Sequence, residues 1–314
     1  MAIIIKEATS AHELQDVLSV RYQSILQTGR GADTLFSITK KISDHYDAFP
    51  TTTNVVGYQD GMPVAGIRAY EYHEQDDYAN CLYDFREAVA KLEGSIFNID
   101  MLCLMKEISW MEHFAQTLLK TVVGLLARQK GQHALFLCTK DRVESMEDLG
   151  FEQIAEGYHS KKLALDVVPM IANIPELYDR FILAIKDREI LRFQETFYRI
   201  MYRAGEIMMV EGERGSNAII VESGKIAVVS RVDDTVSRLV SLGPGALVGE
   251  MGLITNEPRS VSIIAETNCT CLAFDRESFL DVLYKNPSRM LDLFQIPAKR
   301  LKDLNKELMK ARSA

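Results

Sequence analysis

The sequence predicts an α+β protein of two domains, in which a mixed α/β sheet domain precedes a β-roll (jelly roll) with flanking helices. Apolar residues repeat with helical and strand periods in alternation up to about residue 168, as in a sheet covered by helices. Short apolar runs separated by glycine turns follow in the second half. Pro169 and Pro175 stand between the two patterns. We therefore predict one domain over 1–168 and a second over 174–314, which includes a terminal helix.

Composition and charge limit the class of protein. A chain of 314 residues suffices for about two domains. The formal net charge of −8 argues against a nucleic-acid-binding surface, which needs a basic patch. No apolar run approaches the roughly 20 residues that span a bilayer, and the N-terminus lacks a signal-peptide pattern. The five cysteines and six histidines have no metal-ligand spacing, so we expect a cytoplasmic protein with reduced thiols and no metal site.

The first domain is predicted to follow the order β–α–β–β–α–β–α–β–α–β. Its first helix begins at a capping box, Ser10-x-x-Glu13, and a hairpin turns at Gln59-Asp60-Gly61. The predicted strands are Ile3–Glu7, Asn54–Tyr58, Met62–Tyr72, Ile96–Ile108, Ala134–Cys138, one that opens at Gly150, and Ser160–Val168. The further helices are predicted at Phe85–Leu92, along the stripe from Phe114 to Leu126, and at Asp141–Leu149.

Five charged residues stand where these elements meet. They are Arg21 on the first helix, Asp44 and Asp47 in the polar loop 28–53, Arg68 in the hairpin, and Glu107, which opens Glu-Ile-Ser at the end of the long strand. This order resembles that of the acyl-homoserine-lactone synthases and the related long-chain N-acyl amino acid synthases, which have the acyltransferase fold of the acetyltransferase superfamily. The resemblance covers about 1–168 and implies transfer of an acyl group from a thioester to an amine.

The resemblance also implies a role for each of the five residues. Glu107 would accept the proton of the attacking amine, directly or through water, while N–H groups of a splayed strand would hold the oxyanion. Arg21 and Arg68, held by Asp44 and Asp47, would fix the carboxylate of the acceptor bidentately. The alternative is a lattice of ion pairs that only clamps the loop.

The stretch after Glu107 bears on the acyl donor. Acetyltransferases hold the pyrophosphate of CoA with a glycine-rich turn at a helix N-terminus. Trp110–Gln116 contains no glycine, and Glu112 would repel a diphosphate. An acyl carrier protein as donor, or a degenerate site, is therefore favoured over acetyl-CoA.

The second domain is organised around Val248–Ile254, a short helical turn between two strands. Its first turn offers backbone N–H groups at Gly252 and Leu253, and Arg259 follows on the same loop. Backbone donors with a single guanidinium suit a phosphodiester monoanion. Glu250 can accept a hydrogen bond from a ribose hydroxyl.

This stretch resembles the phosphate-binding cassette of cyclic-nucleotide-binding domains, and the strands and glycine turns over about 174–300 follow the order of that family. The resemblance implies that Glu250 binds the ribose 2′-hydroxyl and Arg259 the cyclic phosphate of cAMP or cGMP. The residues assigned to the nucleotide are Gly249, Glu250, Gly252, Leu253, Arg259 and Ser260. Val261 stands where the family usually has alanine. The alternative is a degenerate β-roll in which Glu250 and Arg259 pair with each other.

Together the two resemblances predict an N-acyltransferase regulated by a cyclic nucleotide, with the amine of an amino acid as acceptor. The alternative is a non-catalytic nucleotide sensor whose degenerate acyltransferase-like domain binds a ligand or partner. A transcription regulator is disfavoured, because about thirty residues after the roll are too few for a helix-turn-helix. The amphipathic stretch Lys299–Lys310 can cap the base, pack on the first domain or form a homodimer.

Overall fold

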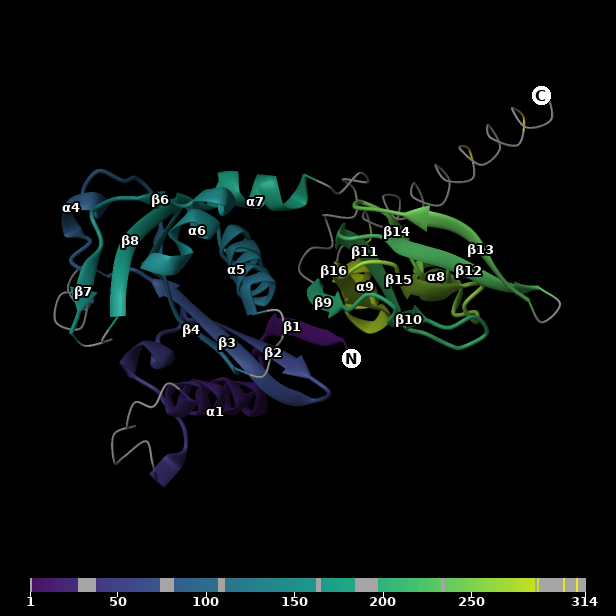
Figure 1. Cartoon of the computed structure of the whole chain (residues 1–314), viewed down its shortest axis with the longest axis horizontal. Helices are drawn as coiled ribbons and strands as arrows, with labels where there is room; N and C mark the ends of the chain where they lie inside the picture. The colour runs from purple at the N-terminus through teal and green to yellow at the C-terminus, as the bar shows by residue number, and fades with distance from the viewer. Residues whose placement is uncertain are drawn as a thin grey trace. The chain divides into compact units, whose positions relative to one another are not determined.

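The structure is a computed structural model that divides into two compact units, Ile3–Ile182 and a second unit that begins at Leu183 (Figure 1). It describes residues 2–27, 38–73, 82–106, 111–161, 165–183, 197–232 and 235–285, and the single residues 287, 302 and 309. The first unit is built on a mixed sheet and the second is a β-roll, which confirms the predicted fold class.

The sheet of the first unit combines antiparallel and parallel pairing. Its strands, in spatial order, are β1 (Ile3–Glu7), β2 (Thr53–Gln59), β3 (Met62–Glu71), β4 (Ile96–Leu104), β5 (His133–Thr139), β8 (Leu165–Asn173) and β6 (Glu152–Gln153), with β7 (Tyr158–Ser160) paired to β8. β4 and β5 run parallel, whereas the other neighbours in this order run antiparallel. A parallel pair requires a crossover, which helix α5 (Met111–Arg128) supplies.

Helices α1 (Ala11–Gln27) and α5 cover opposite faces of the β2–β3 hairpin (Figure 1). A Cβ added to Gly66 would lie 3.4 Å from Val17 of α1, and one added to Gly57 would lie 2.6 Å from the Phe114 ring of α5. Glycine is required at position 57, because the aromatic ring occupies the place where a side chain would begin.

The predicted capping box starts α1. The backbone N–H of Ser10 donates to Glu13 Oε2 at 2.9 Å, and the N–H of Glu13 donates to Ser10 Oγ at 3.2 Å. Although burial acts in the opposite direction, these bonds and Lys6 lower the pKa of Glu13 to about 2. The box satisfies two of the backbone donors that a helix N-terminus leaves free.

Other elements of the first unit are short: η1 (His45–Ala48), α4 (Arg86–Val89), η2 (Lys140–Arg142), α6 (Val143–Leu149) and α7 (Ile174–Ile182). The helix expected over 85–92 has only four α-helical residues, and Phe85 at its N-cap makes no side-chain cap. The strand expected over Ile96–Ile108 ends as β4 at Leu104. Residues 107–110 lie outside the described residues.

The division between the units falls after Ile182, whereas the sequence placed it between 168 and 174. Strand β8 runs on to Asn173, and α7 continues in the first unit. Leu177 of α7 is buried, and Lys120 of α5 lies over the Phe181 ring. Pro175, which the sequence predicts to lie between the domains, instead lies in the first turn of α7, where a missing N–H is tolerated.

The second unit is a roll of two four-stranded sheets. One sheet has the order β14 (Leu247–Val248), β11 (Asn217–Ser223), β16 (Cys269–Asp275) and β9 (Tyr198–Tyr202), and the other has β10 (Ile207–Met209), β15 (Ser262–Ala265), β12 (Ile226–Val232) and β13 (Thr235–Leu242). An apolar core that includes Ile219, Val221, Ile226 and Ile263 joins the two sheets.

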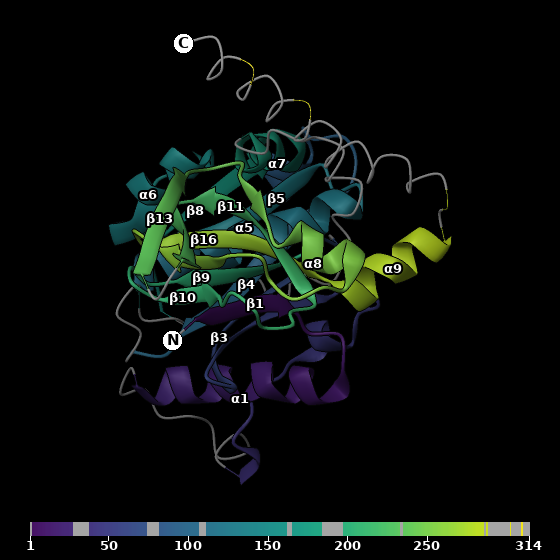
Figure 2. The ribbon, with the colours of Figure 1, turned by 90° about the vertical axis from the view of Figure 1, so that its right-hand side faces the viewer.

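Two helices accompany the roll, α8 (Glu250–Thr255) and α9 (Arg276–Lys285). α9 begins beside the end of α8, where Arg276 Nε donates to the Leu253 carbonyl at 3.0 Å (Figure 2). None of the helices in the described ranges has the length and apolar character needed to cross a bilayer. The same ranges contain no group of three or more His, Cys, Asp or Glu side chains placed to hold a metal ion.

Candidate functional site

The guanidinium of Arg259, in the loop between α8 and β15, is held by the oxygens of neutral groups. Nη1 donates to the Gly249 carbonyl at 2.8 Å. Nη2 donates to the Asn217 carbonyl at 2.5 Å and to Asn217 Oδ1 at 2.8 Å. Arg259 is only 7% exposed, and within the described ranges it forms no ion pair with a carboxylate. It is therefore a buried cation that makes no direct ion pair with a described carboxylate.

Three glycines leave the space that this guanidinium fills. A Cβ on Gly249 would lie 2.8 Å from Nη1, one on Gly252 would lie 3.1 Å from it, and one on Gly215 would overlap Nη2. Gly249 also has a φ of +83°, in the left-handed region where a side chain is strained. These glycines are thus required by the close approach of Arg259 to the backbone.

Helix α8 begins directly beside the arginine, with Gly249 as its N-cap. The N–H groups of a first helical turn lack partners within the helix and point toward an incoming anion. The sequence predicted a free N–H at Leu253, but this group donates to the Gly249 carbonyl at 3.4 Å, because the helix closes its first turn there. The donors offered by α8 therefore lie before Leu253 and include Gly252.

The other residues assigned to the nucleotide lie around Arg259. Glu250 is in the first turn of α8, and its charge acts on Arg259, yet no ion pair joins the two side chains in the described structure. This argues against the alternative of a degenerate β-roll in which Glu250 and Arg259 pair with each other. Ser260 is exposed next to the arginine, and Val261 packs partly against the apolar core of the roll.

The electrostatics of this site favour a bound anion. Burial lowers the pKa of Arg259 from its ordinary value, and the nearby charge of Glu250 acts in the opposite direction. A buried charge without an oppositely charged partner is unfavourable, so an anion that reaches the guanidinium gains a strong interaction. One guanidinium and a few backbone donors match a group that carries a single negative charge.

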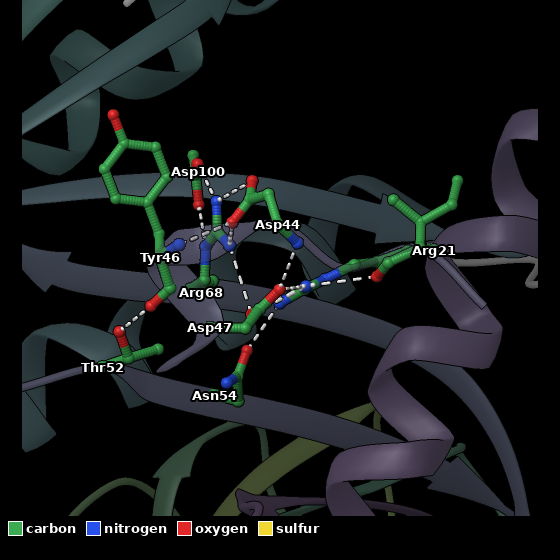
Figure 3. A network of polar contacts seen from close by, with 9 residues as sticks. Arg21, Asp44, Tyr46, Asp47, Thr52, Asn54, Arg68 and Asp100 are labelled. Atoms are coloured by element: carbon green, nitrogen blue, oxygen red, sulfur yellow. Dashed lines mark hydrogen bonds and ion pairs between the residues drawn. The ribbon is translucent and has the colours of Figure 1, made fainter. Parts of the chain in front are cut away.

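A second group of charges lies on the face of the first unit's sheet that α1 covers (Figure 3). At its centre is Arg68 of β3, which is fully buried. Its Nε and Nη2 donate to Asp100 at 2.8 and 2.6 Å, and its Nη1 and Nη2 donate to Asp44 at 2.5 and 3.0 Å. Asp47 Oδ1 lies 3.1 Å from Nη1. Each nitrogen of this guanidinium therefore has a carboxylate partner.

Arg21 of α1 extends the same cluster. Its Nη1 donates to both carboxylate oxygens of Asp47 at 2.9 Å, and its Nη2 donates to Asn54 Oδ1 at 2.6 Å. Its Nε is buried and has no partner within the described residues. Asp47 thus lies between the two arginines and links α1 to β3.

These charges fix the segment around η1 onto the sheet. Asp44 Oδ1 accepts from the N–H of Tyr46 at 3.0 Å and caps η1. The Tyr46 ring stacks on Tyr70 of β3 with centroids 4.3 Å apart, and Arg68 lies beside both rings. Burial opposes the charge of Asp44, but its bonds with Arg68 prevail and hold its pKa below the ordinary value. Charge pairing and stacking together define the position of this segment.

Four of the five residues that the sequence assigned to acyl transfer therefore come together: Arg21, Asp44, Asp47 and Arg68. The fifth, Glu107, lies outside the described residues. Each nitrogen of Arg68 is bound by a carboxylate, and Arg21 is only 1% exposed, so bidentate binding of the acceptor is not supported. The arrangement fits the alternative, a lattice of ion pairs that clamps the loop.

Sequence reasoning missed two members of this cluster, Asp100 and Asn54. Each is a polar residue in a largely apolar strand, and each stands opposite Arg68 in its pairing. A polar side chain in a buried strand requires a partner. The presence of Asp100 and Asn54 in such strands was therefore a signal, in the sequence, of a polar partner such as Arg68.

Strand β4 changes course next to Asp100. Met101 has a φ of 50°, and the register with β3 shifts between Gly66 and Arg68, as in a β-bulge. β4 pairs with β5 only over Ile96–Ile99. The two parallel strands therefore part at about residue 100, whereas residue 107, beside which the sequence predicts a splayed strand, lies outside the described residues.

Comparisons with known proteins concern mainly the second unit. Residues 199–286 match the family described as "Cyclic nucleotide-binding domain". The cyclic AMP receptor protein of Thermus thermophilus is 32% identical over 113 residues, which are 36% of this chain and 52% of that protein. Human cGMP-dependent protein kinase 2 is 38% identical over 115 residues, 36% of this chain and 14% of the kinase. The predicted cyclic nucleotide-binding domain is therefore confirmed, while the chain spans about half of the first relative and less of the second.

Two solved structures are similar to parts of this chain. The catabolite activator protein of Thermus thermophilus matches with a TM-score of 0.35 and 28% identity, over 42% of this chain and 62% of that one. FeeM, an N-acyl amino acid synthase from uncultured soil microbes, matches with a TM-score of 0.42 and 14% identity, over 56% of this chain and 92% of that one.

Proposed function

We propose that this chain binds cAMP or cGMP at Arg259 and that the nucleotide regulates an N-acyltransferase in the first unit. The observation that supports the binding step most directly is the buried guanidinium of Arg259, which has only neutral oxygens as partners. The acyltransferase step is supported by the order of the charged residues and by the splayed β4. The substrates proposed are an acyl thioester, on an acyl carrier protein or CoA, and the amine of an amino acid.

In the proposed nucleotide complex, the cyclic phosphate takes the place in front of Arg259. One phosphate oxygen accepts from the guanidinium, and another accepts from the first-turn N–H groups of α8, including Gly252. Glu250, one residue after the N-cap, accepts from the ribose 2′-hydroxyl. Relatives named for cyclic AMP and for cGMP both occur among the matches, so the proposal covers both nucleotides.

In the proposed acyl transfer, the amine nitrogen attacks the thioester carbonyl. The C–N bond forms and the C–S bond breaks, so the thiol leaves and the amine loses a proton. We assign that proton to Glu107, directly or through water. The oxyanion of the tetrahedral intermediate requires backbone N–H donors, and β4 beyond Ile99, where it leaves β5, has the unpaired edge that such donors need.

The proposed role of Arg21, Arg68, Asp44 and Asp47 is to position the loop beside that strand. Asp100, which binds Arg68, directly precedes the bulged Met101. The clamp therefore connects the loop around η1 to the point where β4 turns away. In this role the four residues contact one another rather than the substrate.

The second candidate is a nucleotide sensor whose first unit does not catalyse. The engaged guanidinium of Arg68 favours it, because each of its nitrogens is already bound by a carboxylate of the protein. The two candidates share the nucleotide site and differ in whether acylated amines accumulate in cells.

Two measurements test the proposal. Calorimetry should detect binding of cAMP or cGMP to the full chain, and Arg259→Ala should abolish this binding while the unfolding transition is kept; equal binding by this variant would refute the role of Arg259.

Mass spectrometry of lipids from cells that overproduce the protein should reveal N-acylated amino acids, which should be lost with Glu107→Gln. A lipid profile unchanged by overproduction would favour the sensor.

A further inference from the structure

We infer that Asn217 is a positioning residue that holds Arg259 toward the nucleotide without adding a negative charge of its own beside the guanidinium. The inference rests on the proposed binding of a cyclic nucleotide at Arg259 and adds a residue to which that proposal assigned no role. Asn217 stands 42 positions before Arg259 in the chain, at the start of β11.

Asn217 binds one end of the guanidinium through two different oxygens. Its carbonyl and its side-chain Oδ1 both accept from Nη2, at 2.5 and 2.8 Å. The Gly249 carbonyl holds the other end through Nη1. Because a guanidinium is planar and rigid, anchors at both terminal nitrogens fix its orientation.

Asn217 is itself held firmly. It pairs with Asp275 across β11 and β16, and the neighbouring Ser216 carbonyl accepts from the N–H of Arg276 at 2.6 Å. Its side chain also hydrogen-bonds the Tyr198 side chain. The side-chain amide has an accepting oxygen and a donating NH2 group. Because Oδ1 accepts from the arginine, the NH2 group is the end available for the bond to Tyr198.

The chemical type of the side chain at position 217 contributes to the charge of the site. An amide accepts from Arg259 without adding charge, so the guanidinium keeps one positive charge for a ligand. A carboxylate of nearly the same shape would accept equally well but would neutralise it, and would lie where it repels a phosphodiester. Arg68 shows the contrast, since three carboxylates surround it and it is left with no donor for a ligand.

The test compares Asn217→Asp with Asn217→Ala in the full chain, by calorimetric titration with cAMP and with cGMP. Asn217→Asp is nearly isosteric, and the Tyr198 hydroxyl can turn to donate to the new carboxylate. If the amide acts through charge, Asn217→Asp should weaken binding by more than about tenfold. Asn217→Ala keeps the backbone anchor and should weaken it by less. A purely structural role predicts the reverse order, because alanine deletes more of the side chain.

Asn268→Asp serves as the matched control. Asn268 is exposed in the same unit, and its Oδ1 accepts from the N–H of Ala204 at 3.0 Å, a bond that a carboxylate preserves. This variant should bind like the wild type. If Asn217→Asp binds as tightly as Asn217→Ala or Asn268→Asp, the inference is overturned while the proposed binding stands. If the wild-type chain binds neither nucleotide, both are overturned.

Discussion

Arg259 occupies a space that its neighbours keep free by having no side chains. Gly215, Gly249 and Gly252 each lie so close to the guanidinium that a Cβ would contact it. The arginine therefore depends on glycines from two separate loops, one before β11 and one around α8. A change at either loop should act on the ligand through the position of the charge.

Gly215→Ala should consequently impair nucleotide binding without unfolding the chain. The added methyl would overlap Nη2 of Arg259 and push the guanidinium off its anchors, and a displaced catalytic or binding group commonly loses about a hundredfold in function. Calorimetry with cAMP and cGMP measures this, with circular dichroism to verify the fold. Gly243→Ala is the control, because no atom of the described residues lies within 4 Å of the Cβ that it adds. Equal losses in both variants would contradict the close-packing argument.

Sequence motifs identify candidate ligand-binding residues better than they identify the groups that hold them. The spacing of Glu250 and Arg259 within one loop was visible in the sequence. Asn217 was not, because it meets Arg259 across 42 positions through the pairing of strands. In the same way, Asp100 joins Arg68 only through the register of β3 and β4. Contacts of this kind depend on register, which single-sequence patterns do not fix.

At the scale of an element, ionic contacts help to attach the segment around η1 to the sheet. Asp44 and Asp47 are its charged residues, and Arg21 and Arg68 are their partners on α1 and β3. Because the arginines are buried, removing a carboxylate leaves a positive charge without its partner inside the protein. The attachment should therefore respond to pH.

Asp44→Asn should destabilise the first unit at neutral pH by about 1–3 kcal/mol in the free energy of unfolding. The pKa of Asp44 is lower in the folded chain than its ordinary value near 3.9. Its contribution is therefore complete above pH of about 4 and disappears as the pH falls through the folded-state pKa. The difference between wild type and variant should shrink on going from pH 7 to pH 3.

Urea unfolding at several pH values measures that difference. Asp60→Asn provides the control, since Asp60 is exposed in the turn of the β2–β3 hairpin with a φ of 53°, which asparagine also tolerates. It should stay within about 0.5 kcal/mol of wild type at every pH. A deficit of Asp44→Asn that does not change with pH would show that the ion pairs are not its cause.

The order of the elements was predictable because each has its own period and its own end signals, such as the capping box at Ser10 and the turn at Gly61. The boundary between the two domains was less predictable. Helix α7 has an amphipathic pattern that is compatible with either unit, and only its packing on α5 decides between them. Local sequence does not reveal which of two apolar faces a helix will cover.

Leu177→Ala tests the assignment of α7 to the first unit. Leu177 is 1% exposed, and its truncation should lower the stability of the first unit by about 2–5 kcal/mol. Nucleotide affinity of the second unit should be unchanged. Leu183→Ala, at a position 73% exposed, should have no measurable effect. Hydrogen exchange resolved by peptide would show which strands lose protection; faster exchange in β9 to β16 with an unchanged first unit would contradict the assignment.

For the whole molecule, the proposed regulation requires that the two units be energetically coupled. A ligand shifts a conformational equilibrium only if it binds the two states with different affinity, and the coupling is then reciprocal. Nucleotide bound at Arg259 must therefore change the stability of the first unit as well as that of the second. This consequence can be measured without knowing the acyl donor or acceptor.

Calorimetric unfolding with cAMP or cGMP at about 100 times its Kd should stabilise the second unit by about 2.7 kcal/mol. If the nucleotide regulates the first unit, the transition of that unit should shift too, and Leu177→Ala identifies it as the transition that moves to lower temperature. Arg259→Ala should abolish both shifts. A shift confined to the second unit would mean that the units are energetically independent, so that nucleotide binding would stand and regulation of acyl transfer would not.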